Sequence, residues 1–282
     1  MDTLHLKMGA LYFILIGLEI IISNYYQLRI VYTWRETVTN FIISILNGLF
    51  DLLIRSGYII VLLILYRYRL TDLQQGIFYW VILFILVDFL LYWMHRLEHQ
   101  SRFFWAAHVT HHSGEHMNLT VGVRASLMRP LYDFLFFIPL SVIGFRPLDI
   151  MLIYSVIQIW AVMQHTEIVR KLGWFEYLIV TPSHHRVHHG SNEKYLDKNM
   201  GMVLIIWDKI FGTFQQELKD EEYEPIRYGL TKAVDRKNFV SILFGEWIDI
   251  MRDVCKKDIG WYERWKYVFG PPGWQPKRRG KE

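Results

Sequence analysis

Histidine is the residue whose placement in this sequence points most clearly to chemistry. Of twelve histidines, all but His5 lie between residues 95 and 189, and eight of them fall in three short clusters. The clusters are His95-Arg96-Leu97-Glu98-His99, His108-Val109-Thr110-His111-His112 and His185-Arg186-Val187-His188-His189. Residues spaced i, i+3 and i+4 share one face of a helix. Each cluster is therefore predicted to present its imidazoles in one direction.

Imidazoles gathered in this way are typical of a metal site. Neutral imidazole is a good ligand for Zn, Cu, Fe and Ni, and eight such ligands exceed what one ion can hold. The economical interpretation is a pair of metal ions. A buried histidine cluster without metal would be costly, because each ring needs hydrogen-bond partners and protonated rings repel one another.

Other polar residues near the clusters are candidates for supporting roles. His165 ends an apolar run and is predicted to be a ninth ligand. Asp88 lies seven residues before His95, on the same helical face. A carboxylate in a membrane helix is usually functional, so we expect Asp88 to orient a ligand histidine; a pair with an arginine is the alternative. His184 would project from another helical face and is expected to support the site rather than bind metal, while His116 stays undecided.

The elements that carry these residues are predicted to be helices, several of them in a membrane. A membrane-spanning helix needs about 20 mainly apolar residues, and the chain is 52% hydrophobic and 16% aromatic, unusually high for a soluble protein. The apolar runs are Met8 to Ile22, Phe41 to Tyr66, Ile77 to Met94, Leu131 to Gly144 and Leu148 to Gln164. Asp51 and Arg55 interrupt the second run, which is either one tilted helix or two elements.

The first histidine cluster begins directly after the run that ends at Met94, which places the metal ions at the membrane boundary. Residues after Gln164 are polar and basic, and the positive-inside rule favours the cytosol for them. We therefore predict an all-α integral membrane helical bundle with a cytosolic, histidine-rich helical cap that holds a di-metal site. Residues 1–76 are the predicted N-terminal membrane helices, 77–217 the catalytic domain, and 218–282 a C-terminal cytosolic helical segment with a basic tail.

Three compositional features narrow the prediction further. Because Cys255 is the only cysteine, an intramolecular disulfide and a thiolate metal site are both excluded. The N-terminus lacks a basic segment followed by a small-residue cleavage site, so the first apolar run is expected to stay as a membrane helix. The net charge of +4 suits contact with anionic lipid, and no nucleic-acid partner is expected.

The histidine clusters and the segment DFLLYWMHRLEH (88–99) resemble the fatty acid hydroxylase / sterol desaturase superfamily. Within it, the chain is most similar to the alkylglycerol monooxygenase branch. The segments that carry this closer resemblance are HVTHHS (108–113), His165-Thr166-Glu167, TPSHHRVHH (181–189), DKNMG (197–201) and LIIWDKIFGTF (204–214). The resemblance covers about residues 80–217 and implies that residues 77–217 are a fatty acid hydroxylase-type catalytic domain.

The resemblance also implies a chemistry. Its di-iron centre would be ligated by His95, His99, His108, His111, His112, His185, His188 and His189. With O2 it would hydroxylate a C–H bond of a membrane lipid, which could be an ether lipid, a fatty acyl chain or a sterol-like molecule. The external reductant of the branch is tetrahydrobiopterin. Asp88, Glu167 and His184 are the candidate catalytic residues, and the active site would lie on the cytosolic side of a bacterial inner membrane or the endoplasmic reticulum.

Three other functions fit parts of the pattern. A desaturase could use the same di-iron site, because hydroxylation and desaturation share hydrogen abstraction. A zinc or nickel transporter could also carry histidine clusters, although transporters usually keep their ligands at mid-membrane. A zinc-dependent hydrolase would need a general base beside an open metal position, for which Glu98, Glu115 and Glu167 are candidates.

Overall fold

Helices account for the secondary structure of this protein, seen here in a computed structural model. The structure describes residues 2–26, 32–219, 222–231 and 238–276, with side chains from residue 12 onward. Within these ranges the only β-structure is two isolated bridges, Ile179 with Leu204 and Gly190 with Tyr228. The predicted all-α fold is thus confirmed, while the predicted basic tail at 277–282 lies outside the described residues.

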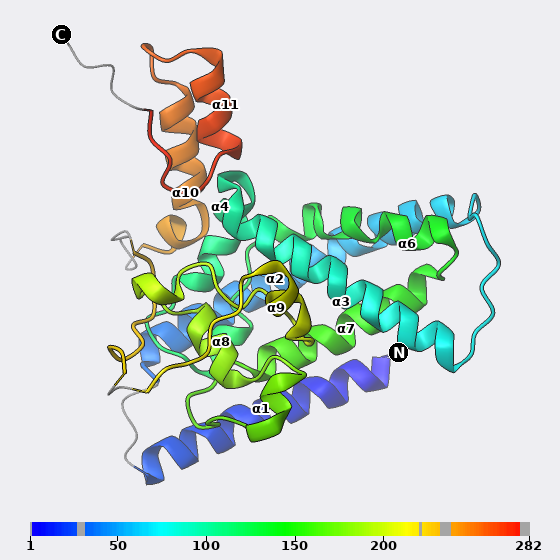
Figure 1. Cartoon of the computed structure of the whole chain (residues 1–282), viewed down its shortest axis with the longest axis horizontal. Coiled ribbons are helices and arrows are strands. Elements are labelled where there is room, and N and C mark those ends of the chain that lie inside the picture. The colour runs from blue at the N-terminus through cyan, green and yellow to red at the C-terminus, as the bar shows by residue number, and fades with distance from the viewer. Residues whose placement is uncertain (1, 27–31, 220–221, 232–237, 277–282) are drawn as a thin grey trace.

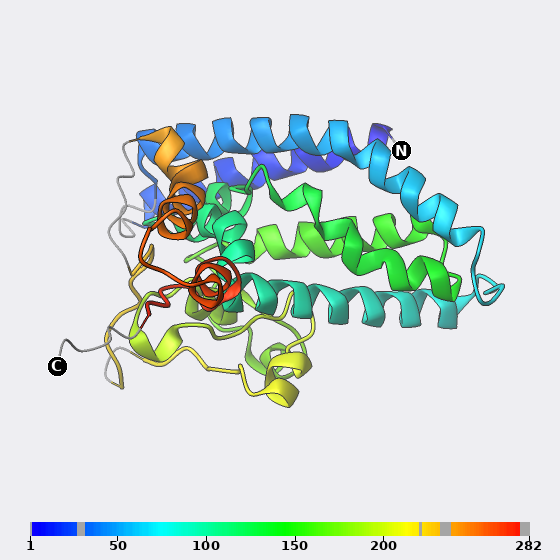
Figure 2. The ribbon, with the colours of Figure 1, turned by 90° about the horizontal axis from the view of Figure 1, so that it is seen from above.

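Four long helices form an elongated bundle. They are α1 (Asp2–Tyr25), α2 (Trp34–Tyr66), α3 (Ile77–Gln100) and α7 (Pro147–Met163). Helix α7 contacts both α2 and α3 and lies between them (Figure 2). By length and composition alone, α2 and α3 could each cross a membrane.

The structure adds one detail to the sequence prediction for α2 and one for α3. Helix α2 is one continuous helix, because Asp51 and Arg55 lie one turn apart and form a salt bridge of 2.5 Å on its surface. Helix α3 continues six residues past the apolar run, so that His95 and His99 belong to its last two turns. His95 and His99 therefore belong to a rigid helix rather than to a loop after it.

The apolar run Leu131 to Gly144 is not one regular helix. After α4 (Arg102–His112) and α5 (Leu119–Gly122), the chain forms the 3-10 helices η1 (Arg129–Leu131) and η2 (Asp133–Phe137), followed by the short helix α6 (Ile138–Ile143). Gly144 ends α6 with a φ of +132°, and a Cβ there would lie 2.3 Å from the Thr71 carbonyl oxygen. Glycine is thus required at this turn, which leads the chain into α7.

The C-terminal end of α3 is covered by short elements. These are α4 (Arg102–His112), α5 (Leu119–Gly122), η3 (Gly173–Tyr177), α8 (Pro182–His188), η4 (Glu193–Tyr195) and α9 (Ile206–Phe211). Helices α10 (Phe239–Val254) and α11 (Trp261–Phe269) form a hairpin that projects from this end of the molecule (Figure 1). Arg102 at the start of α4 pairs with Glu246 and Asp253 of α10, each at 2.6 Å, so α10 fixes where α4 begins.

Candidate metal centre

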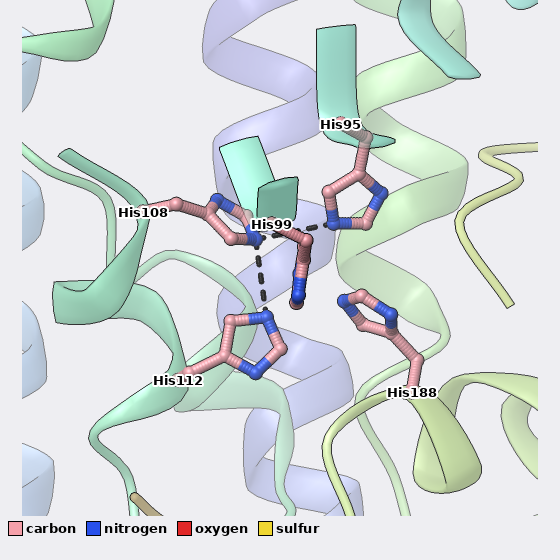
Figure 3. A group of neighbouring side chains, drawn as sticks. All are labelled: His95, His99, His108, His112 and His188. Atoms are coloured by element: carbon pink, nitrogen blue, oxygen red, sulfur yellow. Dashed lines mark hydrogen bonds between the residues drawn. The ribbon is translucent and has the colours of Figure 1, made fainter. Parts of the chain in front are cut away.

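Nine histidines from helices α3, α4 and α8 and from the end of α7 converge beside the C-terminal end of α3. Their ligand nitrogens form two groups, and within each group these atoms lie within 4.8 Å of one another. The first group is His95, His99, His108, His112 and His188 (Figure 3), and the second group is His111, His165, His185 and His189. The structure thus brings together every histidine that the sequence predicted as a metal ligand.

The turn between α3 and α4 sets the two helices face to face. Ser101 has extended backbone angles (φ −120°, ψ 125°), which end α3 and allow α4 to start in a new direction at the next residue. His95 and His99 of α3 then point toward His108 and His112 of α4 (Figure 3). The neighbouring ring of His111 turns to the second group.

Helix α8 divides its rings between the groups in the same way, since His188 joins the first group while His185 and His189 join the second. Its start is fixed by Pro182 at the first helical position and by a capping box. In that box the Thr181 amide donates to Nδ1 of His184 at 3.3 Å. The seven residues of α8 and its C-cap, His189, therefore hold three candidate ligands in place.

His184 itself does not support the predicted role in the reaction. It lies in neither group, its ring packs against Phe214 with a centroid separation of 5.6 Å, and it caps α8. Burial lowers the pKa of His184 to about 4, so the ring is neutral at pH 7 and can accept the Thr181 hydrogen bond. Its function in this geometry is to position α8.

Asp88 has other hydrogen-bond partners than the histidine or arginine that we expected from the sequence. Its Oδ1 accepts the Val203 amide at 2.9 Å, and its Oδ2 accepts the Leu204 amide at 3.1 Å and the Trp207 indole at 2.9 Å. The carboxylate is satisfied by the loop before α9 instead. Because the Met200 carbonyl in this loop accepts from His95, Asp88 reaches the site only through the backbone.

Glu167 and His116 also lie outside both histidine groups. Glu167 is half-buried two residues after His165, and it is hydrogen-bonded to Tyr228. The His116 Nε2 atom lies 3.9 Å from a carboxylate oxygen of Glu36. The catalytic role of Glu167 therefore stays a prediction.

The outward nitrogens of several rings face fixed acceptors. The Nδ1 atoms of His95, His188, His111 and His165 lie 2.9, 2.9, 3.0 and 2.9 Å from the carbonyl oxygens of Met200, Lys198, Arg124 and Ala161, respectively. A carbonyl can only accept, so each of these rings carries its hydrogen on Nδ1. The Nε2 lone pair of each ring is therefore directed into its group.

These inward lone pairs meet at distances that need a cation between them. In the second group, Nε2 of His165 lies 3.1 Å from Nε2 of His111, although both rings already hold their hydrogen on Nδ1. A hydrogen bond would require one ring to be protonated, but burial lowers the pKa of His165 to about 4 and that of His111 well below its usual value. Two neutral rings in this arrangement repel one another, and a metal ion would remove that repulsion.

The first group gives independent evidence that its inward nitrogens need a cation. The Nε2 atoms of His99 and His188 are buried and have no hydrogen-bond partner among the described residues. Leaving a buried polar atom unpaired costs about 1–3 kcal/mol. Burial also holds the pKa of His108, His112 and His188 well below the usual value, so these rings are neutral. Each group could therefore hold a metal ion.

Two carboxylates contact the outward Nδ1 atoms of rings in the first group. The sequence did not single out either of them for such a contact. Glu98 Oε2 lies 3.3 Å from Nδ1 of His108, and Asp197 Oδ1 lies 3.0 Å from Nδ1 of His99. Glu98 belongs to the first cluster and Asp197 to the DKNMG segment, but neither spacing predicts which ring each would reach. A carboxylate behind a ligand histidine fixes its tautomer and makes it a stronger ligand.

A cavity of about 1480 Å³ opens onto the histidines. His99, His112 and His188 of the first group and His189 of the second lie in its wall, and residues of α10 and of the segment 271–275 close it from the other side. The Trp105 ring also lines it, with its centroid 5.3 Å from that of His99. The cavity gives molecules a route to both groups.

Comparison with known proteins agrees with this geometry. Residues 80–213 match the model of the fatty acid hydroxylase family, a range that contains all nine grouped histidines. The chain therefore belongs to the fatty acid hydroxylase family.

Three curated relatives show which kinds of fatty acid hydroxylase this chain is similar to. Alkylglycerol monooxygenase from Homo sapiens is 37% identical over 215 residues, which cover 74% of this chain and 46% of the relative. Alkylglycerol monooxygenase from Xenopus tropicalis is 33% identical over 281 residues, 96% of this chain and 59% of the relative. Ornithine lipid hydroxylase from Rhizobium tropici is 31% identical over 132 residues, 46% of this chain and 40% of the relative. The chain thus spans about half the length of these curated relatives. No solved structure matches it significantly.

Proposed function

We propose that this protein is a membrane-bound di-iron monooxygenase, an oxidoreductase that uses O2 to hydroxylate a C–H bond of a lipid. The observation that carries the proposal is the convergence of nine imidazoles in two groups at the end of an apolar helix. The relatives named as alkylglycerol monooxygenase and ornithine lipid hydroxylase support a lipid substrate. They lend no support to a metal transporter or a hydrolase.

Iron is the metal that we assign to both groups. Imidazole is a suitable ligand for iron, and family membership favours it over zinc or nickel. Two iron ions held there would supply the activation of O2 and the removal of hydrogen from the lipid. The residues themselves hold the ions by their Nε2 atoms, fix each ring through its Nδ1 partner, and limit water through packing such as that of Trp105.

A bilayer is the environment that best fits the long helices. Leu49, Leu52 and Leu53 on α2 are 58%, 69% and 74% exposed, which is costly in water and favourable against lipid. We place residues 1–76 and α3 in the membrane, residues 77–217 in the catalytic domain, and residues 218–282 in a cytosolic segment. The candidate site then lies at the cytosolic boundary, as the basic C-terminal half suggests.

The cavity supports a further part of the proposal. Because it reaches both histidine groups from the side of α10, it offers a path for an external reductant from the cytosol. Tetrahydrobiopterin is the reductant that the sequence resemblance implies. A lipid would approach from the bilayer at the same boundary, where its chain stays in the membrane.

The decisive experiment is a reaction with purified, iron-loaded protein in lipid nanodiscs. An alkylglycerol, an ornithine lipid and a fatty acyl lipid are each supplied with O2 and tetrahydrobiopterin, and products are measured by mass spectrometry. Gain of one oxygen atom supports a monooxygenase, whereas loss of two hydrogen atoms identifies a desaturase. Iron-loaded protein that consumes no O2 with any of these lipids would count against an oxidase that acts on them.

Two histidine variants serve as matched controls. His111→Ala removes a ring of the second group and is expected to abolish lipid oxidation. His116→Ala removes a histidine nearby in sequence whose ring lies outside both groups, and it should keep wild-type activity. Equal activity in both variants would show that His111 is not an essential ligand.

A further inference from the structure

The two histidine groups differ in the acceptors that face the outward Nδ1 atoms of their rings. In the first group, His108 is backed by Glu98 and His99 by Asp197, so two rings have a carboxylate as their outer partner. In the second group, His111 and His165 are backed by backbone carbonyls. A carboxylate carries a full negative charge that a carbonyl lacks, and it strengthens the ligand it contacts.

Glu98 is the better placed of the two carboxylates. It is fully buried, while the Asp197 side chain is 69% exposed. The Tyr132 hydroxyl donates to Glu98 Oε1 at 2.6 Å, and Arg129 Nε lies 3.4 Å from the same oxygen. These contacts leave Oε2, which has no hydrogen bond among the described residues, directed at His108.

Glu98 shares its arginine with a second carboxyl group. Arg129 also lies 3.4 Å from Asp133, whose pKa burial raises to about 7. A cation bound at the inward nitrogen of His108 would be a further favourable partner for the Glu98 carboxylate behind that ring. The inward Nε2 of His108 lies 3.1 Å from Nε2 of both His95 and His112 (Figure 3).

The surroundings described for the second group are neutral. His111 and His165 face backbone carbonyls. The Arg124 side chain, whose backbone carbonyl faces His111, donates to the neutral oxygens of Thr110, Asn40 and Ser113. A carbonyl dipole strengthens a ligand ring less than the charge of a carboxylate does.

From this asymmetry we propose that the two groups bind their ions with unequal affinity, and that Glu98 is the positioning residue that makes the first group the tighter site. Glu98 adds negative charge 3.3 Å behind Nδ1 of His108, which favours a hydrogen on Nδ1 and leaves Nε2 for the metal. The inference rests on the proposed di-metal function and adds an order of loading: the first group fills before the second.

Equilibrium binding of Fe²⁺ to the full-length protein under anaerobic conditions tests the proposal. Metal-free protein in nanodiscs is equilibrated with a series of metal buffers, and bound iron per chain is measured by mass spectrometry. The wild type should bind one ion at lower free Fe²⁺ than the other. His165→Ala, which removes a second-group ligand, should lose the weaker step and keep the tighter one.

Glu98→Gln is the diagnostic variant, since it keeps the size of the side chain and removes its charge. Its tighter step should weaken by about 10–100-fold, as expected for loss of a carboxylate behind a ligand histidine, while the weaker step stays in place. Asp149→Asn is the matched control: this carboxylate is also hydrogen-bonded, but its partners are Gln75 and Tyr79 near the opposite end of α3. It should change neither step.

Asp197→Asn keeps the proposal testable if Glu98→Gln does not fold. Asp197 has a φ of 54°, a conformation that asparagine tolerates well, and its loss of charge should weaken the tighter step by a smaller factor. Two equal binding steps in the wild type overturn the proposal. So does an unchanged tighter step in folded Glu98→Gln or, in its place, in Asp197→Asn. Protein that binds no iron contradicts the proposed function instead.

Discussion

The two histidine groups use the same ligand and share helices α4 and α8, yet their surroundings differ. Carboxylates lie behind His99 and His108 of the first group, whereas backbone carbonyls lie behind His111 and His165 of the second. The first group also supplies three of the four histidines that line the cavity. The comparison teaches that ligand spacing selects the metal-binding atoms, while residues from elsewhere in the chain set how each ion is held.

Removing one ligand from each group should have the largest effect. We expect both His108→Ala and His165→Ala to reduce lipid oxidation by at least about 100-fold, because the reaction requires both ions. Their iron content should differ: His165→Ala keeps one firmly bound ion, whereas His108→Ala loses iron more readily from the first group. Iron analysis after gel filtration measures this, and identical iron loss in the two variants would remove the distinction between the groups.

Asp88→Asn should have the next largest effect, and it should fall on the first group. The amide cannot accept all three hydrogen bonds from the loop before α9, so we expect a loss of stability of about 1–3 kcal/mol. Because that loop contains Met200, which holds His95, the tighter iron-binding step should weaken as well. Thermal unfolding and Fe²⁺ titration measure the two effects. A variant with normal stability would show that these hydrogen bonds contribute little.

Tyr132→Phe tests the difference between the two groups more finely, because it removes a hydrogen bond to Glu98 but keeps the Glu98 carboxylate. The variant deletes the hydroxyl that donates to Glu98 at 2.6 Å, a bond to a charged group worth about 1.5–3 kcal/mol. The tighter step should weaken by a few-fold, less than in Glu98→Gln, and the weaker step should not change. An effect on the second group alone would contradict the assignment of Glu98 to the first.

His184→Ala should have the smallest effect. The change removes the capping contact with Thr181, which is expected to cost about 1 kcal/mol of stability. Both iron-binding steps should remain, because the ring lies in neither group. Loss of one ion from a folded His184→Ala protein would instead make His184 a ligand.

The sequence predicted which histidines would gather, because i, i+3, i+4 spacing determines the helical face of each ring. It also predicted the helical fold from the long apolar runs. The end of the apolar run at Met94 did not mark the end of α3, since hydropathy falls where the helix leaves the apolar layer, and the helical spacing of Asp88, His95 and His99 was the better guide. The partners of Asp88 could not be predicted either, because they lie more than a hundred residues away in the chain.

The contact that Glu98 makes could not be predicted from the sequence either. It was visible inside the first cluster, but its contact with His108 depends on the change of direction at Ser101 and on the placement of Tyr132 and Arg129. No local spacing specifies that turn. Similarly, the sequence places His184 on another helical face than the ligand rings, but only the backbone geometry of α8 identifies it as a cap.

The division of α4 between the two groups has a consequence for how this protein can vary. His111 and His112 are adjacent in the chain but serve different groups, and each residue of a helix is rotated by about 100° from the next. Deleting one residue between His108 and His111 would rotate the later rings away from both groups at once. Natural variants should therefore accept exchanges at Val109 far more readily than any change in the length of this segment.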